Sequence, residues 1–159
     1  MDFGTHFLYP SALFASKEPH VVNTILGSCV AVCLYDPVQK IGAINHYMLP
    51  LWNGQGLASP KYGNIAISKL IEKMLGMGSK QKNLIAKVFG GANIFESNLE
   101  QFQIGERNIK IAEQKRKNEE RDLKIKYENK IYSEKKKKLL IKEIINIFHS
   151  NFLAADEYY

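Results

Sequence analysis

The sequence has few cysteines, no long apolar run, and no glycine or proline after Gly105. Its two cysteines, Cys29 and Cys33, are too few for a disulfide scaffold, and on one strand they are badly placed to bond to each other. No apolar stretch approaches the ~20 residues that cross a membrane. The first residues show no basic region followed by an apolar core. We therefore expect a cytoplasmic protein without membrane insertion.

The composition is that of a globular domain, and its basic residues are densest near one end. The chain has 159 residues, of which 45% are hydrophobic and 24% charged, which is enough for one domain with a core. The net charge is +6, and 12 of the 22 Lys and Arg residues lie after Lys110. These basic residues are mixed with Glu and lack interleaved aromatic side chains, a pattern typical of a solvated face. No nucleic-acid partner is expected.

An apolar hairpin at residues 23–50 is the central feature of the sequence. Apolar and small residues alternate over 30–35, a period of two that is typical of a strand buried on both faces. Asp36 and Pro37 suit the first two positions of a tight turn. The apolar run 41–49 then predicts the returning strand.

The predicted hairpin brings a thiol and an imidazole together. A turn at residues 36–39 would place Cys29 directly opposite His46, with Cβ atoms ~4.5–5.5 Å apart on one face. Such a pair can share a proton, as a nucleophile and its base must. Gly27 and Ser28 predict a chain reversal just before Cys29, where backbone N–H groups outside the ladder are candidate oxyanion donors.

Short motifs at consistent spacing resemble the CheD family of chemoreceptor glutamine deamidases. They cover roughly residues 8–112 and are LGSCVAVCLYDP at 26–37, HYMLP at 46–50, KY at 61–62, AKVFGGA at 86–92 and IGERNI at 104–109. The resemblance implies an α/β fold with a layered, mainly antiparallel sheet and helices packed outside. It also implies hydrolysis of receptor Gln side chains to Glu through a Cys thioester in bacterial chemotaxis.

The resemblance assigns roles to particular residues. It implies that Cys29 is the nucleophile, that His46 is the base, and that a Thr just upstream orients the His. Thr24 is favoured for this last role, and Asn23 remains open. No cofactor and no metal are implied. The implied partners are the cytoplasmic domain of a chemoreceptor and a CheC-type phosphatase.

Further residues are predicted to border the substrate. These are Asn23, Ser28, Phe89, Gly90 and Gly91, since the family's Phe-Gly-Gly-Ala loop lies near its catalytic Cys. The Gly-rich loop at 52–60 is also well placed, although a plain surface loop fits its composition equally well. Outside these segments, the apolar pattern predicts strands at 21–26 and 83–89 and a helix at 62–75.

The C-terminal segment departs from the expected family pattern. We therefore divide the chain into a CheD-like deamidase domain at 1–112 and a divergent basic segment at 113–159. Alternation around 123–127 predicts a short strand, and the apolar spacing over 133–152 predicts an amphipathic helix. Either the sheet lacks its closing strands, or a helix covers the same edge.

Three other interpretations of the central residues stay open. Cys29 alone, in an apolar strand, is more often a small core residue than a nucleophile. Cys29, Cys33 and His46 are also possible zinc ligands, but a fourth ligand is missing from the pattern. Finally, a catalytically degenerate domain would act as a binding module for a chemoreceptor or a CheC-type phosphatase.

Overall fold

A computed structural model of the chain describes residues 3–92, 103–120, 126–127, 141–146 and 154–157. The elements in chain order are β1 (Gly4–Phe7), β2 (Leu13–Ser16), β3 (His20–Leu26), β4 (Val30–Asp36), β5 (Ile41–Asn45), α1 (Gly63–Gly76), the 3-10 helix η1 (Gln81–Asn83), β6 (Ile85–Gly90), α2 (Ile104–Glu120), β7 (Lys126–Tyr127), β8 (Ile141–Asn146) and β9 (Ala154–Glu157). The helix predicted for 62–75 and the strand predicted for 83–89 are confirmed as α1 and β6.

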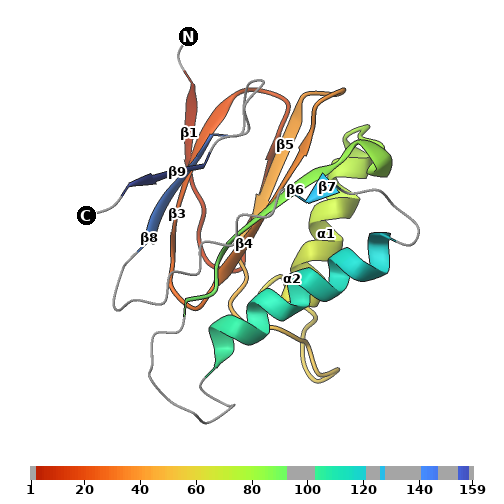
Figure 1. Cartoon of the computed structure of the whole chain (residues 1–159). Helices are drawn as coiled ribbons and strands as arrows, with labels where there is room; N and C mark the ends of the chain where they lie inside the picture. Colours follow the sequence, from red (N-terminus) through yellow and green to blue (C-terminus); the bar gives the residue numbers. More distant parts are fainter. Residues whose placement is uncertain (1–2, 93–102, 121–125, 128–140, 147–153, 158–159) are drawn as a thin grey trace.

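The strands form two sheets, and the helices cover one of them. The first sheet has the order β1-β3-β8-β9, and the second has the order β2-β5-β4-β6-β7. Figure 1 shows the first sheet on one side of the second and both helices on its other side. Neighbouring strands are mostly antiparallel, whereas β1 with β3 and β6 with β7 are parallel. The expected α/β class, with a mainly antiparallel sheet and outer helices, is confirmed.

Strand β4 is buried on both faces because it lies in the middle layer. Val32 and Leu34 belong to the core cluster shared with α1 and α2, whereas Ala31 and Cys33 belong to the cluster shared with β3. The continuous apolar pattern of β4 follows from this double burial. The strand therefore anchors both cores, and residues at its start are held from two sides.

The β4–β5 hairpin forms as expected, but its predicted register is wrong. Cys33 pairs with Ile44, two positions beyond the partner that a turn at residues 36–39 requires. The cause is the side chain of Asp36, whose Oδ1 accepts hydrogen bonds from two backbone N–H groups of the turn at 2.9 and 3.1 Å. Asp36 thus stays in the ladder, and residues 37–40 make the turn. A shift of two positions leaves each side chain on its predicted face.

The helix predicted for residues 133–152 is wrong where the structure describes this segment. Residues 141–146 form β8, which pairs antiparallel with β3 on one side and with β9 on the other. The three isoleucines of β8 suit a strand, and the free edge of β3 offers main-chain partners that a helix would leave unpaired. A strand therefore lies on the edge of β3, and neither expected explanation of the tail is correct. The rest of the predicted helix lies outside the described residues.

Helix α2 crosses the boundary expected at residue 112. It runs without interruption from Ile104 to Glu120, and β7 lies within the short strand predicted around 123–127. The division into two segments stays a prediction. Within the described part of the chain, no helix is long and apolar enough to span a bilayer.

Candidate functional site

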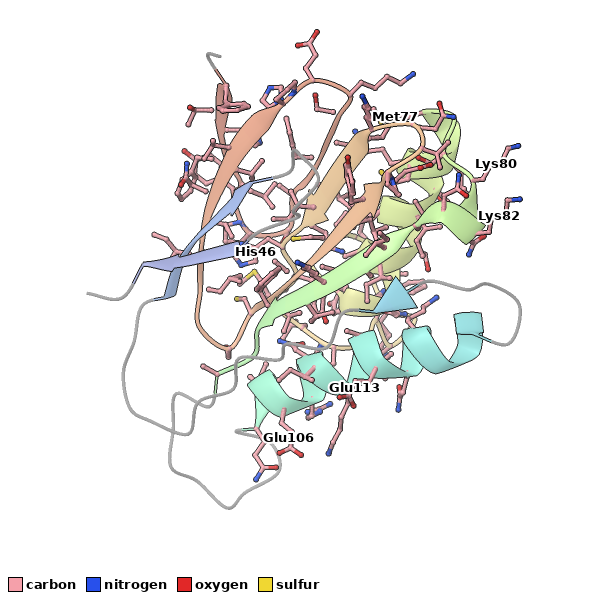
Figure 2. The ribbon with its side chains drawn as sticks, turned by 45° about the horizontal axis from the view of Figure 1, so that its top comes forward. His46, Met77, Lys80, Lys82, Glu106 and Glu113 are labelled. Atoms are coloured by element: carbon pink, nitrogen blue, oxygen red, sulfur yellow. The ribbon has the colours of Figure 1, made fainter. Side chains whose placement is uncertain are left out.

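Thr24 and His46 form a buried hydrogen-bonded pair that links the two sheets. Thr24 lies in β3, and His46 directly follows β5; their exposed fractions are 0% and 1%. Oγ1 of Thr24 lies 2.8 Å from Nδ1 of His46 and 2.8 Å from the carbonyl oxygen of Leu8. Figure 2 shows His46 in the interior, between strands of the two sheets. The structure thus joins the residue predicted as base to the residue favoured for orienting it.

The contacts of Thr24 assign the tautomer of His46. A hydroxyl carries one hydrogen, and the carbonyl of Leu8 can only accept. The O–H of Thr24 therefore donates to Leu8, and its oxygen accepts from Nδ1–H of His46. Nε2 then carries a lone pair. This nitrogen is buried and has no hydrogen-bond partner among the residues that the structure describes.

The environment of His46 favours the neutral ring. Its backbone N–H donates to the carbonyl of Ala12 at 3.1 Å, and its own carbonyl accepts from the N–H of Ser11 at 2.8 Å, so the main chain is held at both ends. Burial lowers the pKa of the imidazole below its ordinary value of 6.5, and the carbonyl of Leu8 opposes part of that shift. At neutral pH, Nε2 is an unprotonated base.

Cys29 directly precedes β4, on the face of the hairpin that carries His46. Val30 and Tyr47 bridge the two segments, each N–H donating to the other carbonyl at 3.0 and 2.9 Å. This pairing makes Cys29 and His46 diagonal neighbours on one face, with an expected Cβ separation of about 7–8 Å. The turn predicted from the sequence would have placed these two residues directly opposite each other, and the observed pairing does not. In the described structure, Nε2 of His46 makes no hydrogen bond with the thiol of Cys29.

The thiol of Cys29 is protonated in the resting site. Cys29 is half-buried, and this burial raises its pKa above the ordinary value of 9.0. The backbone N–H of Cys29 itself lowers the pKa by a smaller amount, because it stabilises the thiolate. Burial therefore favours the neutral form of both Cys29 and His46.

Three successive carbonyls around Cys29 are held by hydrogen bonds. The carbonyl of Gly27 accepts from the N–H of Ala92 at 2.9 Å, and that of Cys29 accepts from the N–H of Gly91 at 2.8 Å. The carbonyl of Ser28, between them, accepts from Nδ2 of Asn108 at 2.8 Å. The corresponding N–H groups of Ser28 and Cys29 donate to no other residue among those described. The chain reversal predicted before Cys29 thus leaves two adjacent donors without a partner in another described residue.

The Phe-Gly-Gly loop holds the Cys29 backbone. Gly90 has φ +92°, and a Cβ there would lie 2.3 Å from the carbonyl oxygen of Cys29. Gly91 has φ +76°, and its missing Cβ leaves room for Ile109 of α2. Phe89 is buried in the cluster between the sheets. The two glycines therefore pack closely around the backbone of Cys29 and α2. Contact of these residues with a substrate stays a prediction.

Asn108 lies in the IGERNI motif at 104–109, but no role was predicted for it from the sequence. Asn108 is fully buried, and its Nδ2 donates to the carbonyls of Ser28 and Met48 at 2.8 and 3.0 Å. It lies four positions before Ala112 on the buried face of α2, whereas Figure 2 shows Glu106 projecting outward from the same helix. A polar side chain on an apolar helix stripe was the available signal, since buried amides require partners.

The remaining predicted residues contribute less to this arrangement. Asn23 alternates with Thr24 along β3 and is half-buried, so its side chain is on the opposite face of the strand. Cys33 is fully buried between the sheets. The described residues contain no group of three or more His, Cys, Asp or Glu side chains able to hold a metal ion. Among the two candidates for orienting His46, Thr24 is the one in contact with it.

Comparisons with known proteins identify the family. A family model described as CheD chemotactic sensory transduction matches residues 48–147. A protein of Sulfurimonas denitrificans named probable chemoreceptor glutamine deamidase CheD is 52% identical over 113 residues, covering 70% of this chain and 72% of the relative. The chain belongs to the CheD family. A CheD relative of the same name from Trichlorobacter lovleyi is 51% identical over 107 residues, covering 67% of this chain and 66% of the relative.

The CheD matches also bear on the tail and on the length of the chain. The family model extends to residue 147, beyond residue 112, where the resemblance was expected to end. A CheD relative from Shewanella oneidensis is 44% identical over 109 residues. The match covers 66% of this chain and 52% of the relative. The chain therefore spans between about half and three-quarters of these CheD relatives.

Proposed function

We propose that this chain is a chemoreceptor glutamine deamidase, with Cys29 as nucleophile and His46 as general base. Curated relatives of the CheD family carry the name of this activity. One observation supports the residue roles above all others. The buried pair of Thr24 and His46 directs an unprotonated Nε2 to the hairpin face on which the thiol of Cys29 lies.

The proposed reaction begins with transfer of the thiol proton of Cys29 to Nε2 of His46. The sulfur attacks the side-chain amide carbon of a receptor Gln, so a C–S bond forms and the carbonyl π electrons move to oxygen. As the oxyanion collapses, the C–N bond breaks, and Nε2–H gives its proton to the departing ammonia. Water then attacks the thioester while Nε2 accepts its proton. The C–S bond breaks, Nε2–H returns its proton to the departing sulfur, and Glu is released with the thiol and the neutral imidazole restored.

The resting protonation states support general-base activation over a preformed ion pair. A thiolate–imidazolium pair would require two charges in a site whose burial raises the pKa of Cys29 and lowers that of His46. The hydroxyl of Thr24 keeps the imidazole in the tautomer that can accept the proton. Thr24 acts through His46 and is therefore a positioning residue.

The proposal extends to partners and location. The substrate is a chemoreceptor, as the names of the relatives indicate for those proteins. The family resemblance implies that the cytoplasmic part of the receptor is the part modified. A cytoplasmic location follows from that substrate. A CheC-type phosphatase, which the family resemblance implies, is a further proposed partner, and a binding titration with the purified phosphatase tests it.

Mass spectrometry of a chemoreceptor cytoplasmic fragment tests the proposed function. The fragment is incubated with the wild-type protein, with Cys29→Ala and with Cys33→Ala. We expect the mass change of Gln to Glu with the wild type and with Cys33→Ala, and none with Cys29→Ala. Cys33→Ala is the matched control because it removes a thiol from the adjoining strand β4, at a site buried between the sheets.

The same experiment distinguishes the enzyme from a binding module. A folded wild-type protein that binds the fragment without changing its mass contradicts the catalytic proposal and supports a degenerate binder. Equal conversion by Cys29→Ala and the wild type contradicts the role of the thiol.

A further inference from the structure

The peptide that joins Ser28 to Cys29 has a defined orientation. The chain has no cis peptide bond among the residues described, so the C=O and N–H of this peptide point in opposite directions. Asn108 draws the carbonyl of Ser28 toward α2 with a hydrogen bond of 2.8 Å. The N–H of Cys29 therefore points away from α2. It donates to no other residue of the described structure, and it is close enough to the sulfur of its own residue to stabilise the thiolate.

Asn108 is held firmly enough to impose this orientation. Its side chain is fully buried, and its two Nδ2 hydrogens are both used, one on Ser28 and one on Met48. Two carbonyl partners require the nitrogen, not the oxygen, of the amide on this side. The backbone carbonyl of Asn108 also accepts a hydrogen bond from the hydroxyl of Tyr47 at 2.7 Å. One residue of α2 thus joins the segment before Cys29 to the segment after His46.

The start of α2 packs directly against the backbone of the glycine loop, with no space for a side chain between them. A Cβ at Gly105 would lie 2.5 Å from the carbonyl oxygens of Gly91 and Ala92. Gly91 in turn donates its N–H to the carbonyl of Cys29. Helix, glycine loop and nucleophile therefore form a continuous set of main-chain contacts, with Asn108 as the side chain among them.

We propose that Asn108 is a positioning residue that presents the N–H of Cys29 to the oxygen of a carbonyl group attacked by the Cys29 thiol. This inference rests on the proposed function for its reaction, though not for its geometry. As the sulfur adds to the carbonyl carbon, negative charge develops on oxygen, and an N–H donor held in advance stabilises it. Without Asn108, the Ser28–Cys29 peptide can rotate, and that donor is no longer held. The charge is then stabilised less well, although the thiol and its base are intact.

Two probes of Cys29 separate this role from general damage to the site. Butyraldehyde adds to the thiol and forms a thiohemiacetal whose oxygen occupies the position of the oxyanion. Iodoacetamide alkylates the thiol by displacement of iodide and creates no such oxygen. We expect Asn108→Ala to weaken butyraldehyde binding and to lower kcat by about 10- to 100-fold, below the full loss typical of a removed oxyanion donor. The alkylation rate and KM change less than about twofold.

The matched control is Lys115→Met, which removes a hydrogen bond from the same helix to Ser68 of α1 without touching the Ser28 carbonyl. It leaves both probes unchanged. Equal losses of aldehyde binding and alkylation in Asn108→Ala would overturn the proposal, as would unchanged aldehyde binding in the folded variant. Asn108→Asp preserves side-chain volume but not the donors, and it is measured alongside in case the cavity of the Ala variant prevents folding.

Hydrogen exchange on the wild type provides an independent test. The amide hydrogen of Cys29 exchanges rapidly in the free protein and slowly with butyraldehyde bound. No slowing would overturn the assignment of this N–H as a donor. Because neither probe requires a receptor, an Asn108-dependent aldehyde response without Gln conversion would reject the proposed function alone.

Discussion

The hydroxyl of Thr24 has two partners and one hydrogen, so its removal affects both a carbonyl and an imidazole. We expect Thr24→Val to lower kcat by about 100-fold, the lower end of what a positioned base contributes. Leaving the carbonyl of Leu8 unpaired costs about 1–3 kcal/mol of unfolding free energy. Thr24→Ser keeps the hydroxyl and retains most activity. Ammonia release measures kcat, and urea unfolding measures the stability. An active Thr24→Val would contradict the orienting role.

The pKa of His46 predicts how activity depends on pH. Burial lowers this pKa below 6.5, so the fraction of unprotonated Nε2 is already high at pH 6.5. We expect kcat/KM to rise with pH along an acid limb whose midpoint lies below 6.5, and His46→Gln to abolish the reaction. The check is a pH–rate profile of ammonia release. A midpoint above 6.5 would contradict the assignment of the limb to a buried, neutral imidazole.

The same shift affects stability in a defined direction. As pH falls below about 6.5, the His of the unfolded chain takes up a proton that the folded site resists, so the unfolding free energy decreases. Above that pH the ring is neutral in both states, and its contribution is constant. Urea titrations between pH 5 and pH 8 measure this dependence, and it should be smaller in His46→Gln.

At the residue scale, the sequence predicted roles for Cys29, His46 and Thr24 and left the choice between Thr24 and Asn23 open. The structure shows the contact between Thr24 and His46, and the catalytic roles stay predictions. The Thr24 contact with His46 depends on how β3 packs against the end of β5, which sequence spacing does not encode. The contact of Asn108 was not predicted, because its partner Ser28 is 80 positions away in the sequence. Buried amides at such separations are recognisable only once the packing is known.

At the scale of elements, the glycine loop after β6 allows a matched pair of substitutions. Gly90 and Gly54 have nearly the same φ, +92° and +89°, but a Cβ would meet the carbonyl of Cys29 only at Gly90. Both changes to Ala incur a backbone cost of about 1–2 kcal/mol. We expect Gly90→Ala to lose more stability than Gly54→Ala, and to lower kcat as well. Equal unfolding free energies for the two variants would contradict the tight contact.

Strand β8 determines what covers the edge of β3, the strand that carries Thr24. We expect truncation after Tyr127, which removes β8 and β9 and keeps β7, to lower the melting temperature and kcat together, because β3 loses its antiparallel partner. Thermal unfolding followed by circular dichroism, with ammonia release on the same samples, provides the measurement. An unchanged melting temperature would show that the pairing contributes nothing.

The errors at this scale have physical causes. The hairpin register was missed because the Asp36 side chain lengthens the turn, an effect that a two-residue turn signal does not capture. The tail helix was predicted from a 3.6-residue spacing of isoleucines that equally suits a strand once a partner edge is available. Pairing with β3 is therefore the reason that residues 141–146 form a strand and not a helix.

At the scale of the whole molecule, the layer arrangement explains why the fold class was predictable. The middle sheet must bury both faces, and β4 shows this directly as an apolar run without polar alternation. The contacts that connect one layer to the next cannot be predicted from a short stretch of sequence. Contacts between α2, the glycine loop and the reversal before Cys29 join segments far apart in the chain, and they became visible only in three dimensions.

The span of the Asn108–Ser28 contact has a consequence for biosynthesis. Because the chain is translated from its N-terminus, Cys29 and His46 leave the ribosome well before the helix that holds the Ser28 carbonyl. The nascent chain therefore contains the thiol and the imidazole before it contains the group that holds the Ser28 carbonyl. We expect an unfinished chain, which lacks this helix, to react with amides more slowly than the finished protein.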